Sequence, residues 1–216
     1  MEHRRLGRTG LRVSSVGLGT MTWGRDTDEL EAKEQLDIFL DAGGTLVDTA
    51  ASYGEGVSEE VIGTLLREHV DRQDLVLVSK AGVRTWRTGE RSSVADASRG
   101  SLLDTLDTSL ARLGTDHLDL LLVQVPDPST SLEETAHALS LAVSSGRTRY
   151  VGIANHPAWA SVRMHDLLSE CGRGPGLAAV EVEHSLLSRG IERELRPASQ
   201  ALGFGIVGYA PLGRGV

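Results

Sequence analysis

The chain has 216 residues, 40% of them hydrophobic, and a formal net charge of −8 from 30 acidic and 22 basic residues. This balance disfavours a general nucleic-acid binder and suits a protein that handles small molecules. The single cysteine, Cys171, excludes an internal disulfide framework. The N-terminus shows no apolar signal segment, and no apolar run approaches the ~18 residues of a membrane span. We therefore expect a cytoplasmic protein that binds neither membrane nor nucleic acid.

Seven short apolar runs recur along the chain and predict β-strands. Each is continuously apolar rather than alternating, which is typical of parallel strands covered on both faces. Their spacing is that of repeated βα units. The runs are 16–20, 45–50, 75–80, 119–124, 150–155, 178–183 and 204–209.

Helical patterns with recognisable ends lie between these runs. A leucine stripe within residues 102–113 stops at Gly114, the residue type that most often ends a helix. Ser131 and Glu134 have the spacing of a capping box, and Ser58 is interpreted as the cap of the helix that follows it. The polar segment 83–98 is predicted to be a long surface loop.

Repeated βα units predict either a doubly wound sheet or a (β/α)8 barrel. The dinucleotide fingerprint of a wound sheet would place a third glycine after Gly17 and Gly19, but Thr22 stands there. Polar residues close to strand ends favour the barrel, whose chemistry sits at the carboxyl rim of the strands. No linker or composition break divides the chain, so we expect one domain over residues 1–216.

Three polar residues stand at or next to the predicted strand ends, namely Asp48, Lys80 and Gln124. Tyr53 follows Asp48 after a short loop and can reach the same place. A phenol with an ordinary pKa of ~10 is a poor general acid, but a nearby ammonium lowers that pKa and a carboxylate holds the ammonium charged. Asp48, Tyr53 and Lys80 are therefore expected to deliver a proton to an alkoxide.

Several specific motifs occur in order along the chain: "LGRTGLRVSSVGLGTM", "DTAASYGEGVSEEVIG", "LVSKAG", "VGIANH", "VEVEHSLLSR" and "GYAPLGRG". Together they resemble the aldo-keto reductase family, most closely the longer bacterial members and the reductase-like potassium-channel β-subunits. The resemblance implies a (β/α)8 TIM barrel that reduces a small-molecule carbonyl substrate with NADPH. It also implies that the hydride comes from the nicotinamide and the proton from Tyr53. No metal is expected.

The resemblance also implies a set of cofactor-binding residues. Asn155 would hydrogen-bond the nicotinamide carboxamide, and Tyr209 would stack on the nicotinamide ring. Glu181 stands where the family usually has Gln, and an ionised carboxylate there could accept a hydrogen bond but not donate one. The remaining expected contacts are Gly19, Thr20 and Met21 after the first strand, and Ala210, Pro211, Leu212, Gly213 and Arg214 along the pyrophosphate.

Two departures from the family pattern stand out. Gln124 occupies the position of a substrate-orienting His; it can still donate a hydrogen bond but does not titrate. An amide at this position keeps a second hypothesis open, a nucleotide-binding regulatory barrel with slow turnover. The pattern also ends after the seventh strand, without the eighth strand and the segment that holds the adenosine phosphate. We expect a truncated barrel cut from a longer protein, the alternative being a short form that closes by association.

Overall fold

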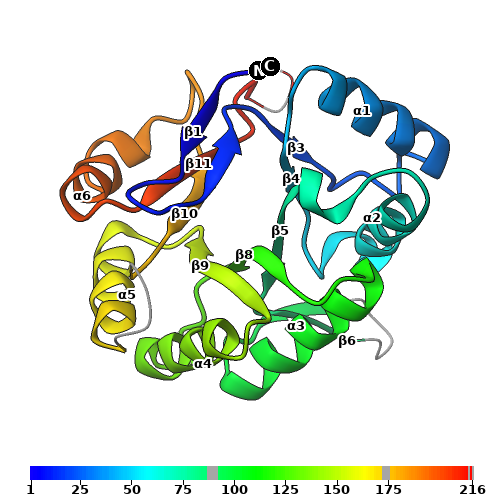
Figure 1. Cartoon of the computed structure of the whole chain (residues 1–216). Coiled ribbons are helices and arrows are strands. Elements are labelled where there is room, and N and C mark those ends of the chain that lie inside the picture. Colours follow the sequence, from blue (N-terminus) through cyan, green and yellow to red (C-terminus); the bar gives the residue numbers. More distant parts are fainter. Residues whose placement is uncertain (87–91, 172–175, 214, 216) are drawn as a thin grey trace.

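Seven parallel strands form the central sheet of the computed structural model, which describes residues 1–86, 92–171, 176–213 and 215. The strand order is β11-β10-β9-β8-β5-β4-β3. The strands are β3 (Gly17–Gly19), β4 (Leu46–Asp48), β5 (Val76–Ala81), β8 (Leu118–Val123), β9 (Thr148–Ala154), β10 (Ala179–Glu183) and β11 (Gly205–Tyr209). Figure 1 looks along the curled sheet, with its helices outside. Among the described residues no pairing joins β3 to β11. The predicted barrel, open after its seventh strand, is confirmed.

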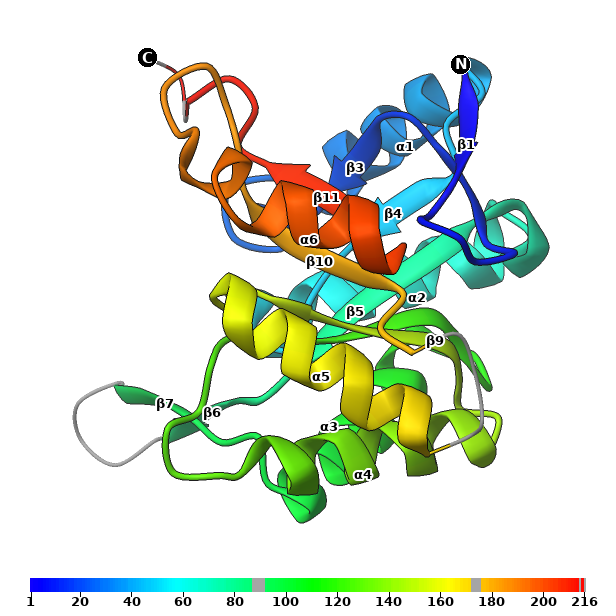
Figure 2. The same cartoon turned by 90° about the vertical axis from the view of Figure 1, so that its left-hand side faces the viewer.

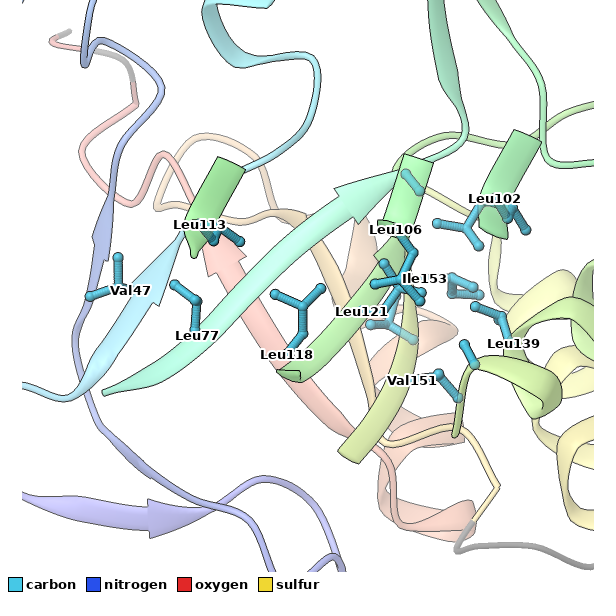
Figure 3. Close-up of a cluster of buried hydrophobic side chains, with 14 of the residues drawn as sticks. Val47, Leu77, Leu102, Leu106, Leu113, Leu118, Leu121, Leu139, Val151 and Ile153 are labelled. Atoms are coloured by element: carbon cyan, nitrogen blue, oxygen red, sulfur yellow. The ribbon is translucent and has the colours of Figure 1, made fainter. Parts of the chain in front are cut away.

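Helices cover the outer face of the curled sheet. They are α1 (Glu29–Asp41), α2 (Val57–Glu68), α3 (Arg99–Leu113), α4 (Leu132–Ser144), α5 (Ala158–Glu170) and α6 (Leu195–Leu202), with 3₁₀ turns η1 (Tyr53–Gly56), η2 (Arg72–Asp74) and η3 (Gly190–Glu192). Figure 3 shows Leu121 of β8 close to Leu106 of α3, within one buried cluster that also contains Leu77 of β5 and Leu139 of α4. Burying a leucine of this kind stabilises the fold by roughly 1.5–3 kcal/mol. This outer layer fixes the strands and leaves their inward side chains to build the site.

An N-terminal hairpin closes the end of the barrel where the strands begin. Its strands are β1 (His3–Arg5) and β2 (Arg12–Ser14), paired antiparallel. Leu6 and Val13 pack with inward side chains of the sheet, and the Arg8 amide donates to the Gly203 carbonyl at 2.7 Å. The hairpin therefore leaves the carboxyl ends of the strands as the open rim. Figure 2 shows β1 and β7 at opposite ends of the molecule.

The loop predicted over residues 83–98 is wrong. Two strands, β6 (Val83–Trp86) and β7 (Ser92–Ala95), pair antiparallel, with Val83 opposite Ala95. The prediction failed because the segment is polar: an exposed hairpin lacks the apolar run that marked the barrel strands.

The predicted cap at Ser58 is also wrong. Helix α2 begins at Val57, after Gly56 with φ 100°. The Ser58 hydroxyl is fully buried and donates to the Thr20 carbonyl at 2.9 Å. It also lies 2.9 Å from the Thr49 hydroxyl. Ser58 therefore ties the ends of β3 and β4 to α2 rather than satisfying the helix terminus.

The predicted ends of α3 and α4 are confirmed in a modified form. Gly114 follows α3 with φ 65°, and the Ser131 hydroxyl accepts from the Glu134 amide at 3.2 Å. The Glu134 side chain turns to the neighbouring helix, where it accepts from the Arg99 amide at 3.0 Å. Only the Ser131 half of the capping box is therefore present, because the Glu134 carboxylate binds the first turn of α3 instead of the backbone of Ser131.

Candidate active site

Strand alternation points three ionisable side chains into the barrel. Asp48 ends β4, Lys80 lies near the end of β5, and Glu181 lies in β10. The residues before two of them, Val47 and Val180, pack outward in the helix-covered core. Because neighbouring residues of a strand face opposite sides, Asp48 and Glu181 face inward. The barrel thus gathers these charges near its carboxyl rim.

Lys80 is the centre of the site. Its Nζ lies 2.7 Å from Oδ1 and 2.6 Å from Oδ2 of Asp48. It also donates to the Thr49 carbonyl at 3.1 Å and to the Tyr53 hydroxyl at 3.2 Å. Lys80 is only 2% exposed. Burial alone would lower the pKa of Lys80, but Asp48 and Glu181 together raise it above its ordinary value. The ammonium therefore stays charged.

Tyr53 has a raised pKa, contrary to the expectation from the sequence. Burial of the phenol is the largest cause; the Lys80 ammonium opposes it, and the Asp48 and Glu181 carboxyls add to it. The sequence argument counted the ammonium but not the burial of the ring. At neutral pH Tyr53 consequently holds its proton, beside a cation that can stabilise the phenolate after the proton leaves.

The backbone after Tyr53 turns sharply before α2. Gly54, Glu55 and Gly56 follow one another with φ values of 58°, 59° and 100°. A left-handed conformation costs a residue with a Cβ about 1–2 kcal/mol, so Glu55 carries strain that the two glycines avoid. This turn returns the chain from the rim and holds the phenol over Lys80, whose Nζ is 5.0 Å from the ring centroid.

Glu181 is a second carboxyl beside the same ammonium. Its Oε1 lies 3.4 Å from Lys80 Nζ, and its Oε2 is buried without a hydrogen-bond partner among the described residues. Burial, reinforced by Asp48 and only partly offset by Lys80, raises the pKa of Glu181 to about 8. Asp48 holds the ammonium with both oxygens, so Glu181 is the carboxyl that keeps its proton. As a neutral acid it can donate, which corrects the expectation of an acceptor-only side chain.

Gln124 follows β8 and is held from two sides. Its backbone amide donates to the Ala81 carbonyl at 2.8 Å. The Ser52 hydroxyl donates to Gln124 Oε1 at 2.9 Å. That bond occupies the carbonyl end of the side chain and assigns the NH2 end as its free donor. Ser52 was missed in the sequence, where its position directly before Tyr53 was the only signal.

Asn155 connects two strand ends. It has φ 62°, in the left-handed region that Asn tolerates better than most residues. Its Nδ2 donates to the Gln124 carbonyl at 2.9 Å, and its Oδ1 accepts from the Tyr209 hydroxyl at 2.7 Å. The structure thus brings these predicted cofactor residues together at the rim, with Asn155 bracing β8 against β11.

The residues expected beside the cofactor after β3 differ in exposure. Met21 is 54% exposed, whereas Thr20 is fully buried. The Thr20 hydroxyl bonds to the Asp48 carbonyl at 3.0 Å and lies 2.8 Å from the Ser58 hydroxyl. Thr20 therefore supports the site from within, through the protein groups that its hydroxyl contacts. Gly19 is exposed at the end of β3.

The turn after β11 holds the other expected cofactor residues. Ala210 and Gly213 have φ values of 51° and 61°, and the Gly213 amide donates to the Ala210 carbonyl at 2.9 Å. Pro211 and Leu212 between them are exposed. Arg214, predicted to meet the pyrophosphate, lies outside the described residues.

A surface groove of about 560 Å³ borders the site. It is lined by Ala51, Ser52, Glu55, Val83, Arg84, Ser101, Asp104, Thr105, Thr108 and Arg112. The groove does not include Lys80, so the chemistry is located by the ionisable groups and not by this hollow. Among the described residues, no group of His, Cys, Asp and Glu side chains could hold a metal ion. No described helix is both long and apolar enough to cross a membrane.

Comparisons with known proteins agree with this geometry. The model of the "Aldo/keto reductase family" matches residues 15–216. The uncharacterized oxidoreductase YrpG of Bacillus subtilis is 34% identical over 230 residues, which cover all of this chain and 68% of YrpG. The aldo-keto reductase YhdN of the same organism is 31% identical, over all of this chain and 63% of YhdN. The chain therefore spans about two thirds of the length of these relatives.

A solved structure shares the same architecture. The aldo-keto reductase AKR11C1 from Bacillus halodurans, in its holo form, superposes with a TM-score of 0.83 at 30% identity, over all of this chain and 68% of that one. The family match, the relatives and the shared fold all point to one family. The chain belongs to the aldo/keto reductase family, a family of NAD(P)H-dependent oxidoreductases.

Proposed function

We propose that this chain, with the rest of the protein to which it belongs, reduces aldehydes or ketones to alcohols with NADPH, and that Tyr53 donates the proton. The observation that carries the proposal is the contact of 3.2 Å between the Tyr53 hydroxyl and a Lys80 ammonium gripped by both oxygens of Asp48. When bound, the nicotinamide supplies the hydride. The chain supplies the proton from Tyr53 and, through Lys80, the positive charge that stabilises the resulting phenolate.

The raised pKa of Tyr53 fits a general acid for reduction. The phenol stays protonated at neutral pH, because its burial outweighs the pull of Lys80. As negative charge develops on the carbonyl oxygen, the Tyr53 proton moves to that oxygen and the product leaves as an alcohol. The phenolate that remains lies against the ammonium. Asp48 keeps the ammonium fixed, so little reorganisation is needed when the proton leaves.

Gln124 is proposed to orient the carbonyl. Because Ser52 binds its Oε1, the NH2 group of Gln124 is free to donate to a substrate oxygen. A neutral amide can hold the carbonyl without titrating. This arrangement favours the enzyme over the regulatory barrel, since the amide is oriented for donation.

The residues around Glu181 suit a nicotinamide nucleotide. Among the described residues its buried Oε2 has no hydrogen-bond partner, so it can bond to a ligand. Tyr209 and Asn155 lie at the same rim. A neutral Glu181 can donate to a carboxamide oxygen as the usual Gln would. The exposed turn of residues 210–213 is proposed to follow the pyrophosphate. We expect NADPH to be preferred in the longer protein, and only weakly by residues 1–216.

Replacing Tyr53 by Phe tests the proposal. Turnover of a panel of aldehydes with NADPH is expected on the order of 1 per second, an ordinary enzyme rate. Tyr53→Phe should lower it by ~10²-fold or more, because the general acid is lost. Nucleotide binding, measured by quenching of protein fluorescence, should survive. A variant that keeps more than about a tenth of the parent rate would contradict the role of Tyr53. Tight binding without turnover in the parent would support the regulatory barrel instead.

A further inference from the structure

Two carboxyls share one buried ammonium in the barrel. Asp48 contacts Lys80 Nζ at 2.6 and 2.7 Å, and Glu181 Oε1 lies 3.4 Å from the same atom. Glu181 is 5% exposed. A buried charge is costly unless it is matched, and one ammonium matches one carboxylate. Glu181 is therefore a surplus acid, placed beside the proton donor of the site.

The surroundings of Glu181 show which groups control its ionisation. Its register neighbours on β9 and β11 are Ala154 and Val207, which carry no charge. The ionisable groups that face it come from β4, η1 and β5, and they are Asp48, Tyr53 and Lys80. Burial and the Asp48 carboxylate favour its neutral form, and Lys80 only partly offsets them. The charge of Glu181 therefore acts electrostatically on the Tyr53 phenol.

We propose that the protonation of Glu181 sets the charge beside Tyr53 and thereby the upper pH limit of carbonyl reduction. This inference rests on the proposed function. With Glu181 neutral, Asp48 and Lys80 cancel and the phenol faces no net charge. With Glu181 ionised, an uncompensated negative charge lies at the site. That charge raises the proton affinity of the Tyr53 phenolate and opposes the negative charge that forms when Tyr53 gives up its proton.

The sign of the effect follows from the pKa of Glu181, which is about 8. Below that pH the acid is neutral and reduction proceeds. Above it the ionised carboxylate slows proton transfer, although Tyr53 itself is still protonated. Glu181→Gln keeps the size and the neutral state of the side chain and removes its titration. The variant should therefore lose the decline near pH 8 and keep only the decline caused by ionisation of Tyr53.

Rate profiles test the proposal. The kcat of the parent should fall about threefold or more between pH 7 and 9.5, and that of Glu181→Gln by less than about twofold over the same range. Glu133→Gln, which removes an exposed carboxylate of α4, is the control and should follow the parent. If Glu181→Gln declines with the parent's midpoint, another group causes the decline and the proposal fails.

A second measurement needs no turnover. Tyr53 ionisation can be followed by ultraviolet absorbance as the difference from Tyr53→Phe, since the chain has three tyrosines. Tyr53 should ionise at a lower pH in Glu181→Gln than in the parent, because a nearby negative charge has been removed. Carbon-13 NMR of labelled glutamate side chains should show Glu181 titrating near pH 8. Equal Tyr53 midpoints in the two proteins overturn the coupling. If the Tyr53 midpoint shifts but the protein does not turn over carbonyls, the coupling between Glu181 and Tyr53 stands and the proposed carbonyl reduction is rejected.

Discussion

Replacing Asp48 by Asn tests whether Glu181 can replace Asp48 as the ion-pair partner of Lys80. Lys80 is 2% exposed, and removing the partner of a buried charge typically costs about 3–5 kcal/mol. In Asp48→Asn, the negative charge that adds to the effect of burial on Glu181 is gone, and an unpaired ammonium lies 3.4 Å away. Glu181 should then ionise and restore the pairing. We expect Asp48→Asn to cost only about 1–2 kcal/mol at pH 7, and Asp48→Asn with Glu181→Gln about 3–5 kcal/mol.

Urea unfolding at pH 7, followed by circular dichroism, measures these differences. Glu181→Gln alone should raise the free energy of unfolding at pH 7, because the parent must protonate on folding a glutamate that is ionised in the unfolded chain, and Gln removes that cost. The double variant should therefore lose more than the sum of the single variants. The comparison holds if all variants share one unfolding slope. If the single losses add to the double loss within about 0.5 kcal/mol, Glu181 does not replace Asp48 and the shared-ammonium argument is wrong.

The site leads to three further predictions. The folded pKa of Glu181, about 8, lies above its ordinary value of 4.5, so its stabilisation is complete below pH 4.5 and is lost as the pH rises through 8. Thermal unfolding should therefore show that Glu181→Gln gains stability relative to the parent between pH 5 and 8, with little further gain above pH 8; an unchanged difference between pH 5 and 8 would contradict the raised pKa. Gln124→Leu should lower kcat for every carbonyl tested more than it weakens nucleotide binding, because it removes the donor. Ser52→Ala should lower kcat less, by several-fold, since the amide is freed but not removed. If Gln124→Leu is as fast as the parent, residue 124 is not part of the machinery.

The barrel strands were predictable because their signal is local. A strand covered on both faces must be apolar along its length, and runs such as 119–124 and 150–155 show this without any knowledge of their partners. The β6–β7 hairpin (83–86 and 92–95) carries no such signal. Its pairing is formed by backbone bonds within a mainly polar segment, which a search for apolar runs passes over.

The position of the candidate site was also predictable, since Asp48 and Lys80 stand near the ends of parallel strands and these ends meet at one rim. The support beneath it was not. Ser58 has the spacing of a helix cap, yet its hydroxyl joins the ends of β3 and β4. Ser52 contacts Gln124 across 72 positions of the chain. Such contacts depend on the curvature of the sheet, which no short segment encodes.

The charge state of the site was the least accessible property. The expectation from the sequence placed Tyr53 beside a Lys80 that Asp48 keeps charged, and an ammonium beside a phenol lowers the phenol pKa. In the barrel the burial of the phenol, together with the Asp48 and Glu181 carboxyls, outweighs the ammonium and raises the pKa of Tyr53. Glu181 lies far from Tyr53 in sequence, and its charge acts on the phenol because β10 and β5 bring Glu181 to Lys80, which contacts Tyr53. The closed space that makes Tyr53 hold its proton thus also makes Glu181 hold one, and a single solvent-excluded charge pair governs both.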